Sequence, residues 1–119
     1  MLQSNIKLSI IIPCYNEENY IKNLLQELLE KIDPFEIIII DDNSSDKSIE
    51  IIESFNQEKI ILLKNDTNRG KGYSLKRGFD KAKGEVICIQ DADPEYSPKD
   101  IEILIEPFSN KNTSLVIGT

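Results

Sequence analysis

The stretch Val86-Ile87-Cys88-Ile89-Gln90-Asp91-Ala92-Asp93 decides the fold of this chain, because a short apolar run there passes directly into two carboxylates. The four apolar residues predict a buried strand, and Asp91 and Asp93 follow where the chain leaves the sheet. In an Asp-x-Asp turn both carboxylates can reach one hard cation, Mg²⁺ or Mn²⁺, which proteins usually share with a diphosphate. The same residues also fit an Asx turn that only ends a strand. The tetrad alone leaves both interpretations open.

Two further apolar runs also end in polar segments, and they favour the binding interpretation. Ile37 to Ile40 passes into Asp41 to Asp46, and Leu8 to Ile12 passes into Pro13 to Glu18. In open α/β sheets, ligands bind outside the carboxyl ends of the strands, where the strand order reverses. Three strands that end in polar turns therefore predict one ligand site.

The composition is that of a single globular domain. The chain has 119 residues, of which 39% are hydrophobic and 29% are charged, enough to form one core. The formal net charge of −7 argues against nucleic acid as a partner, because no basic stripe offsets it. The absence of histidine excludes histidine metal ligands and a histidine general base. We expect no signal peptide in Met1 to Asn5, and no span of a bilayer, which needs about 20 apolar residues.

Cys14 and Cys88 both lie at or inside predicted strands. They are expected to be small buried hydrophobic residues rather than a disulfide or a metal pair. Two reduced cysteines favour a reducing compartment. The sequence therefore predicts a cytoplasmic protein.

Strand-like and helix-like segments alternate along the chain. The first helix has apolar residues at helical spacing from Ile21 to Ile32, with Asn16 as its expected N-cap. Asp33-Pro34 ends this helix, and Gly84 is expected to end a later one as its C′ residue. Alternating elements imply parallel βαβ units, and hence an α/β fold with a mainly parallel sheet. The predicted strands are 8–12, 36–40, 59–63, 85–89 and 114–117, and the predicted helices are 17–32, 46–55, 73–83 and 97–108.

A polar loop, Asn65 to Gly72, contains two glycines. It is not a Walker A loop, because Gly72 rather than serine or threonine follows Lys71. It is not a dinucleotide fingerprint either, because no third glycine stands at the required spacing.

Simpler explanations exist for several polar residues. Asp41 and Asp42 can be helix caps, and Asp46 can be a first-turn helix charge. Arg69 and Lys71 can be solvated charges of an exposed loop.

Four motifs occur along the chain in a fixed order: Ser9 to Glu18, Asp41 to Asp46, Asn68 to Gly72 and Gln90 to Asp93. In this order they resemble family 2 glycosyltransferases with the GT-A fold. The resemblance is greatest to the branch of dolichyl-phosphate mannose synthase and the bacterial polyprenyl-phosphate glycosyltransferases. It implies a Rossmann-like three-layer sandwich with strand order 3-2-1-4, in which the second and fourth strands flank the first.

The resemblance also implies roles for individual residues of a site for a nucleotide-diphosphate sugar. Asp42 would hydrogen-bond the base or the ribose, and Lys71 and Arg69 lie where the glycine loop nears the donor. Asp91 and Asp93 would form the metal-diphosphate element with Mg²⁺ or Mn²⁺, and Asp93 is the stronger candidate ligand. The remaining residues that the resemblance assigns are Pro13, Tyr15 and Glu17 in the nucleoside pocket, Ala92 between the aspartates, and Glu95 as a third metal-side group.

The activity that the resemblance implies is transfer of a sugar from a GDP- or UDP-linked donor to an acceptor. A polyprenyl phosphate is one such acceptor, and it would bring the protein to the cytoplasmic face of a membrane. In the family, the acceptor-side half and its general base follow the fifth strand. We therefore expect residues 1–119 to be one truncated domain that holds the donor-binding half, with the general base beyond Thr119. Such a domain is expected to be weak or inactive alone and to self-associate through its exposed surfaces.

Two other function classes fit parts of the sequence. Ile37 to Asn43 resembles the first strand and acidic pair of a signalling receiver domain, with Asp91 as the phosphoacceptor. Against this, a complete strand-helix unit precedes the acidic pair, and the lysine expected after a later strand is absent. The other alternative is a nucleotide-binding module without catalytic activity.

Overall fold

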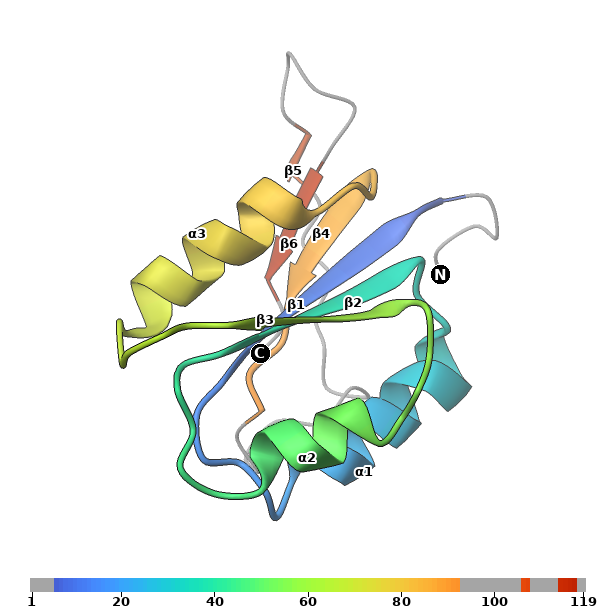
Figure 1. Cartoon of the computed structure of the whole chain (residues 1–119). Coiled ribbons are helices and arrows are strands. Elements are labelled where there is room, and N and C mark those ends of the chain that lie inside the picture. The colour runs from blue at the N-terminus through green and yellow to red at the C-terminus, as the bar shows by residue number, and fades with distance from the viewer. Residues whose placement is uncertain (1–5, 93–105, 108–113, 118–119) are drawn as a thin grey trace.

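The computed structural model describes residues 6–92, 106–107 and 114–117, and it shows a six-stranded sheet with helices on both faces (Figure 1). The strands lie in the order β3-β2-β1-β4-β6-β5, so the predicted order 3-2-1-4 is confirmed. All neighbouring strands are parallel except β5 and β6. The strands are β1 (Leu8–Cys14), β2 (Glu36–Asp41), β3 (Ile60–Lys64), β4 (Val86–Ile89), β5 (Glu106–Pro107) and β6 (Ser114–Ile117). The helices are α1 (Ile21–Glu27), its π-helical continuation η1 (Leu28–Ile32), α2 (Ser48–Glu53) and α3 (Lys71–Lys81).

The alternation of side chains along the central strands produces three layers. Ile10 and Ile12 of β1 are fully buried on one face of the sheet, in a cluster that includes Leu25 of α1. Ile11 lies between them in sequence and is buried on the opposite face, where Phe79 of α3 packs. Figure 1 shows α1 and α2 on one side of the sheet and α3 on the other. Because helices cover both faces, the strands are continuous apolar runs rather than alternating ones.

The first helix begins later than the sequence predicts. α1 starts at Ile21 without a side-chain cap, so the predicted N-cap role of Asn16 is wrong. Asn16 has a φ of 52°, and its amide oxygen accepts the N–H of Ser45 at 2.8 Å in the loop after β2. The predicted end is confirmed, because Asp33 adopts a left-handed conformation with φ 50° after η1, directly before a proline.

Gly84 does not act as the C′ residue of α3, because the helix ends at Lys81 and its C-cap is Ala82 in an extended conformation. The physical need for glycine is a close approach of two backbones. A Cβ on Gly84 would lie 2.4 Å from Ser9 Oγ and 2.7 Å from the carbonyl oxygen of Lys7. The glycine therefore allows the chain to enter β4 directly against the start of β1.

Most of the predicted helix over 97–108 lies outside the described residues, but its predicted end is wrong. Glu106–Pro107 form β5, which pairs antiparallel with β6. Proline lacks an N–H donor, so it disfavours a helix interior and is tolerated in an edge strand such as β5. The predicted strand over 114–117 is confirmed as β6, which pairs with β4.

Both cysteines are buried, as predicted, and neither of them is part of a disulfide. They lie on the neighbouring strands β1 and β4. Cys88 of β4 is paired with Ile10 of β1, and Ile10 precedes Cys14 by four residues. Four residues of strand correspond to roughly 13 Å, which is too far for the two thiols to form a disulfide with each other.

Candidate functional site

The carboxyl ends of β1, β2, β3 and β4 meet at one edge of the sheet, where backbone hydrogen bonds continue past the paired strands. Because these bonds anchor the start of each loop, the polar residues that follow the strands are held in fixed positions. Three such bonds run from Asp42 N–H to Cys14 O, from Asn65 N–H to Asp41 O and from Gln90 N–H to Ile11 O, at 2.9, 2.8 and 2.9 Å.

The turn after β1 is fixed against the loop after β2. Asp41 accepts the N–H of Ser44 at 2.8 Å and its hydroxyl at 2.6 Å, so it orders the loop and does not cap α2. Asp46 lies before the first turn of α2, so its predicted place in that turn is wrong. Three N–H groups of the turn donate to side chains of this loop and of the first residue of α2. Those of Asn16 and Glu18 donate to Ser44 Oγ and Asp46 Oδ2 of the loop, at 2.9 and 3.1 Å, and that of Glu17 donates to Ser48 Oγ of α2 at 2.9 Å.

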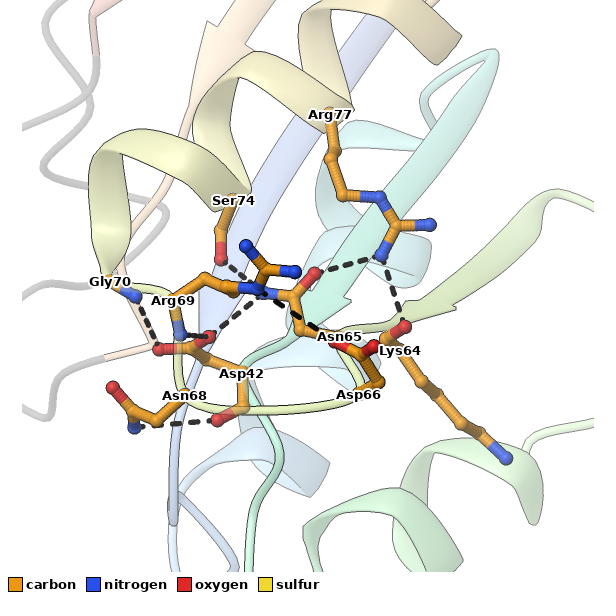
Figure 2. Close-up of polar contacts among 9 residues, drawn as sticks. All are labelled: Asp42, Lys64, Asn65, Asp66, Asn68, Arg69, Gly70, Ser74 and Arg77. Atoms are coloured by element: carbon orange, nitrogen blue, oxygen red, sulfur yellow. Dashed lines mark hydrogen bonds and ion pairs between the residues drawn. The ribbon is translucent and has the colours of Figure 1, made fainter.

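Asp42 holds the loop between β3 and α3 (Figure 2). Its Oδ1 accepts the backbone N–H of Arg69 at 2.7 Å, and its Oδ2 accepts that of Gly70 at 3.0 Å. Its Oδ1 also accepts the side-chain amide of Asn65 at 2.8 Å. Gly70 is the N-cap of α3 and has a φ of 93°, a conformation that favours glycine. The carboxylate therefore fixes the point at which α3 begins.

These contacts also set the charge of Asp42. Burial opposes its ionisation, but the N–H of Arg69, the amide of Asn65 and the N–H of Gly70 outweigh this, so the pKa of Asp42 lies below its ordinary value. A carboxylate has about four acceptor positions, and three of those on Asp42 are occupied. The predicted hydrogen bond between Asp42 and a base or ribose stays a prediction, and among the described residues one acceptor position on Oδ2 has no donor.

Ser74 and Arg77, two residues that orient Asn65, were not predicted from the sequence. Its amide nitrogen also contacts Ser74 Oγ at 3.0 Å, and its amide oxygen accepts Arg77 Nη1 at 2.8 Å (Figure 2). Arg77 Nη1 also donates to the carbonyl oxygen of Lys64 at 3.0 Å. Asn65 is the first residue after β3, as Asp42 is the first after β2, and this equivalence is the signal that could have identified it.

Lys71 and Asp91 come together at the same edge of the sheet. Lys71 Nζ, from the first residue of α3, lies 2.6 Å from Asp91 Oδ1, just after β4. The side chain of Asp91 is 28% exposed and that of Lys71 is 57% exposed. Gln90 is buried, and its amide nitrogen donates to the carbonyl oxygen of Asp91 at 3.0 Å, which orients this turn.

The structure places the other predicted site residues less closely together. Pro13 lies in β1 opposite Ile40, Tyr15 is 48% exposed in the turn that follows, and Glu17 belongs to the same turn. Ala92 is buried in the core cluster on the α1 and α2 face, so its side chain does not face solvent. Asp93 and Glu95 lie outside the described residues.

At the carboxyl edge of the sheet, the described residues supply one candidate ligand for a hard cation, which is Asp91. Asp91 offers a partly exposed carboxylate oxygen, the donor type that Mg²⁺ and Mn²⁺ prefer, and it already holds the ammonium of Lys71. Among residues 6–92, 106–107 and 114–117 there is no group of three His, Cys, Asp or Glu side chains that could hold a metal alone. Such a cation would therefore be shared with a ligand or with residues beyond Ala92.

Comparison with known proteins decides the family. The family model for glycosyl transferase family 2 matches residues 9–119. The chain belongs to glycosyl transferase family 2. A dolichyl-phosphate beta-glucosyltransferase, ALG5A of Trichomonas vaginalis, is 30% identical over 131 residues, which cover 98% of this chain and 41% of that relative. This family 2 chain thus spans about two fifths of the length of the curated relative.

Solved structures of similar chains show the same fold. S. aureus TarS 1-349 in complex with UDP is 32% identical, with a TM-score of 0.68 over 74% of this chain and 28% of that one. The mannosyltransferase PcManGT from Pyrobaculum calidifontis, in complex with GDP-Man and Mn²⁺, is 27% identical, with a TM-score of 0.67 and the same coverage of 74% and 28%. The predicted GT-A fold is confirmed.

The receiver-domain alternative is wrong. Receiver domains have the flavodoxin-like strand order 2-1-3-4-5, with the first strand between the second and third. In this family 2 chain β1 lies between β2 and β4, and β3 is an outer strand of the sheet.

Proposed function

We propose that residues 1–119 form the donor-binding part of a glycosyltransferase that uses a nucleoside-diphosphate sugar. The observation that carries the proposal is the placement of Asp42 after β2 and Asp91 after β4, on the two sides of β1. Two strand spacings correspond to about 10 Å, which matches the reach from a base to a diphosphate. The family match supports this proposal, as do the UDP and GDP-Man that two structural neighbours contain.

The donor would lie across the carboxyl edge with its two ends on different strands. The nucleoside end contacts the turn after β1, which carries Tyr15 and Glu17, together with Pro13 and Asp42. The diphosphate end contacts Lys71 and the segment Asp91-Ala92-Asp93. The donor can be a GDP-linked or a UDP-linked sugar, since one neighbour is in complex with GDP-Man and another with UDP.

A divalent cation, Mg²⁺ or Mn²⁺, belongs to this proposal. Asp91 would hold it together with Asp93, and Glu95 follows on the same segment. When bound, the cation neutralises the negative charge that develops on the departing diphosphate. The structure of PcManGT is a complex with GDP-Man and Mn²⁺, which supports a metal of this class.

The reaction is a displacement at the anomeric carbon of the sugar. An acceptor oxygen forms a bond to that carbon while the bond to the diphosphate oxygen breaks, and the nucleoside diphosphate leaves with the electron pair. Residues of this chain bind and orient the donor, and Lys71 supplies positive charge beside the leaving group. A hydroxyl acceptor needs a base within hydrogen-bond reach, whereas an ionised phosphate acceptor needs none.

We propose a polyprenyl phosphate as the acceptor class. The supporting observation is the similarity to the dolichyl-phosphate beta-glucosyltransferase, because the alignment covers 98% of this chain. None of the helices in the described ranges has the length and apolar character that crossing a bilayer requires. A lipid-linked acceptor would bring the protein to a membrane surface.

Thermal shifts with a panel of nucleotide sugars in Mn²⁺ test the donor class. We expect UDP- or GDP-linked sugars to raise the melting temperature, because structural neighbours are in complex with UDP and with GDP-Man. The exposed Glu58→Gln exchange, in the segment before β3, is the matched control and should leave the shift unchanged. No stabilisation by any nucleotide sugar would contradict the proposal.

A transfer assay separates the enzyme from a binding module. The whole protein should move labelled sugar to a polyprenyl phosphate in vesicles, and the chain alone should bind donor with little turnover. Donor binding without transfer by the whole protein would favour the inactive module.

A further inference from the structure

Lys71 and Asp91 are 20 residues apart in sequence, and their contact joins the start of α3 to the turn after β4. Lys71 opens α3 on one side of the sheet edge, and Asp91 follows β4. Their atoms Nζ and Oδ1 are 2.6 Å apart, although both side chains keep contact with solvent. A cation thus already lies on the carboxylate that the proposed function assigns to the metal.

The backbone beneath Lys71 is fixed, so the side chain is the part of this contact that can move. The preceding Gly70 donates its N–H to Asp42 and accepts the N–H of Ser74 at 3.2 Å through its carbonyl oxygen. A lysine on such an anchor has four flexible carbons and a compact charge. Its ammonium can therefore leave Asp91 while α3 remains in place.

The neighbouring cation of this loop is engaged elsewhere. The guanidinium of Arg69 lies over the ring of Tyr73, 4.9 Å from its centre, and its Nε is 3.8 Å from Asp66 Oδ1. Lys71 is thus the cation that the structure places on Asp91.

We propose that Lys71 is a resident counter-ion of Asp91, which leaves the carboxylate when a divalent cation binds and then moves to the phosphate oxygens of the nucleotide. The inference rests on the proposed function and adds to it an exchange within the same site. Without nucleotide, a divalent cation competes with Lys71 for Asp91. With nucleotide, the displaced ammonium has a second anionic partner, so its loss from Asp91 is compensated.

This exchange couples the binding of the metal to that of the nucleotide. Each ligand favours the arrangement in which Lys71 has left Asp91, so each raises the affinity for the other by the same factor. This coupling comes from the movement of Lys71, and it adds to the coupling that direct contact between metal and diphosphate produces. Removal of the Lys71 charge should weaken the coupling and at the same time tighten binding of the metal alone.

Electron paramagnetic resonance of free Mn²⁺ measures the first effect. In Lys71→Met we expect Mn²⁺ alone to bind about twofold to fivefold more tightly than in the wild type, the range for a pair this exposed. Lys71→Arg keeps the charge and should stay within twofold of the wild type. Lys76→Met is the matched control, because Lys76 lies on the same helix and pairs with Asp80 at 3.9 Å, so it should change nothing.

The second effect is the ratio of Mn²⁺ affinities with and without UDP, and likewise with GDP. This ratio should fall at least twofold in Lys71→Met and stay at the wild-type value in Lys76→Met. An unchanged ratio, or an unchanged affinity for Mn²⁺ alone, in Lys71→Met would overturn the exchange.

Acetylation rates of individual lysines, read by mass spectrometry, provide a measurement on the wild-type protein. Mn²⁺ alone should raise the rate at Lys71 relative to Lys76 at least twofold, and Mn²⁺ with nucleotide should lower it again. A rate at Lys71 that saturating Mn²⁺ does not change would overturn the inference. Failure of the proposed function is distinguishable, because it removes nucleotide binding but not the response of Lys71 to Mn²⁺ alone.

Discussion

The two ends of the parallel sheet hold their carboxylates in opposite ways. At the amino end, Glu36 is 5% exposed and accepts the Ser9 hydroxyl at 2.6 Å and the backbone N–H of Lys83 at 2.6 Å. Ser9 Oγ in turn accepts the N–H of Gly84 at 2.8 Å. The hydrogen-bond donors to the Glu36 carboxylate are therefore uncharged groups, a hydroxyl and a backbone N–H.

At the carboxyl end, Asp91 is paired with the ammonium of an exposed and flexible side chain, that of Lys71. Asp42 lies at the same end but resembles Glu36, because it is buried and bonded to N–H groups. Structural and exchangeable carboxylates can thus be distinguished by their partners. A carboxylate that backbone donors occupy holds a loop or strand in place, and one that a mobile cation neutralises can exchange that cation for a ligand.

The largest expected effect is on stability and comes from the amino end. Glu36→Ala leaves the Ser9 hydroxyl and the Lys83 N–H without their acceptor, at about 1–3 kcal/mol for each such buried donor. We expect the free energy of unfolding to fall by about 2–4 kcal/mol in chemical denaturation. The exposed Glu58→Ala should stay close to the wild type. A loss equal to that of Glu58→Ala would show that Glu36 is not structural.

Two glycines sharpen the comparison at a smaller scale. Gly84→Ala places a Cβ 2.4 Å from Ser9 Oγ at the amino end, whereas a Cβ on Gly72 meets nothing within 4 Å among the described residues. We expect Gly84→Ala to lower the free energy of unfolding by about 1–3 kcal/mol. Gly72→Ala should raise it by about 0.5 kcal/mol, since alanine restricts the unfolded chain. Equal effects of the two exchanges in urea denaturation would contradict this picture of the amino end.

The acid sensitivity of folding tests the structural role of Asp42. Because its pKa is lower in the folded than in the unfolded state, its stabilising contribution is present above the ordinary pKa of aspartate. That contribution is lost as the pH falls from about 4 toward the lower folded pKa, since the unfolded state binds the proton first. Asp42→Asn should therefore flatten the loss of stability between about pH 5 and 2. A wild-type pH dependence in Asp42→Asn would refute this role.

The smallest expected effect is chemical and concerns Cys14 at the end of β1. Burial, with the negative charge of Asp41, raises the pKa of the Cys14 thiol to about 12, so the reactive thiolate is scarce at neutral pH. Alkylation by iodoacetamide at pH 8 should be negligible in the native protein and complete in urea, as read by mass spectrometry. Rapid native labelling of Cys14 would mean that the turn after β1 opens.

The strand order and the three layers followed from the resemblance of four ordered motifs to a known family, whereas the alternation of strands and helices was predictable from the chain itself, because apolar runs and helical spacing depend on local sequence. The role of Gly84 was not, since its reason is the approach of Ser9 from a strand 75 residues away in sequence. The hydrogen bond between Asn16 and Ser45 is equally non-local. It explains why Asn16 holds the loop after β2 and does not cap the first helix.

At the site, the sequence identified which strand ends carry polar residues but not which of these residues bond to one another. Asp42 was identified from the sequence as a candidate donor-binding carboxylate, a role that stays a prediction, whereas its anchoring of the Arg69 and Gly70 N–H groups depends on how the β3–α3 loop folds back. The predicted donor roles of Tyr15 and Asp93 stay predictions.

We propose that the carboxyl end of the sheet binds a nucleoside diphosphate together with a divalent cation. Calorimetric titration of the chain with UDP and with GDP, in Mn²⁺ and in EDTA, measures this binding. We predict that at least one nucleotide binds in Mn²⁺, that EDTA weakens this binding at least tenfold, and that Asp93→Ala abolishes the dependence on Mn²⁺. Equal affinities with and without Mn²⁺, in both the wild type and Asp93→Ala, would contradict the account.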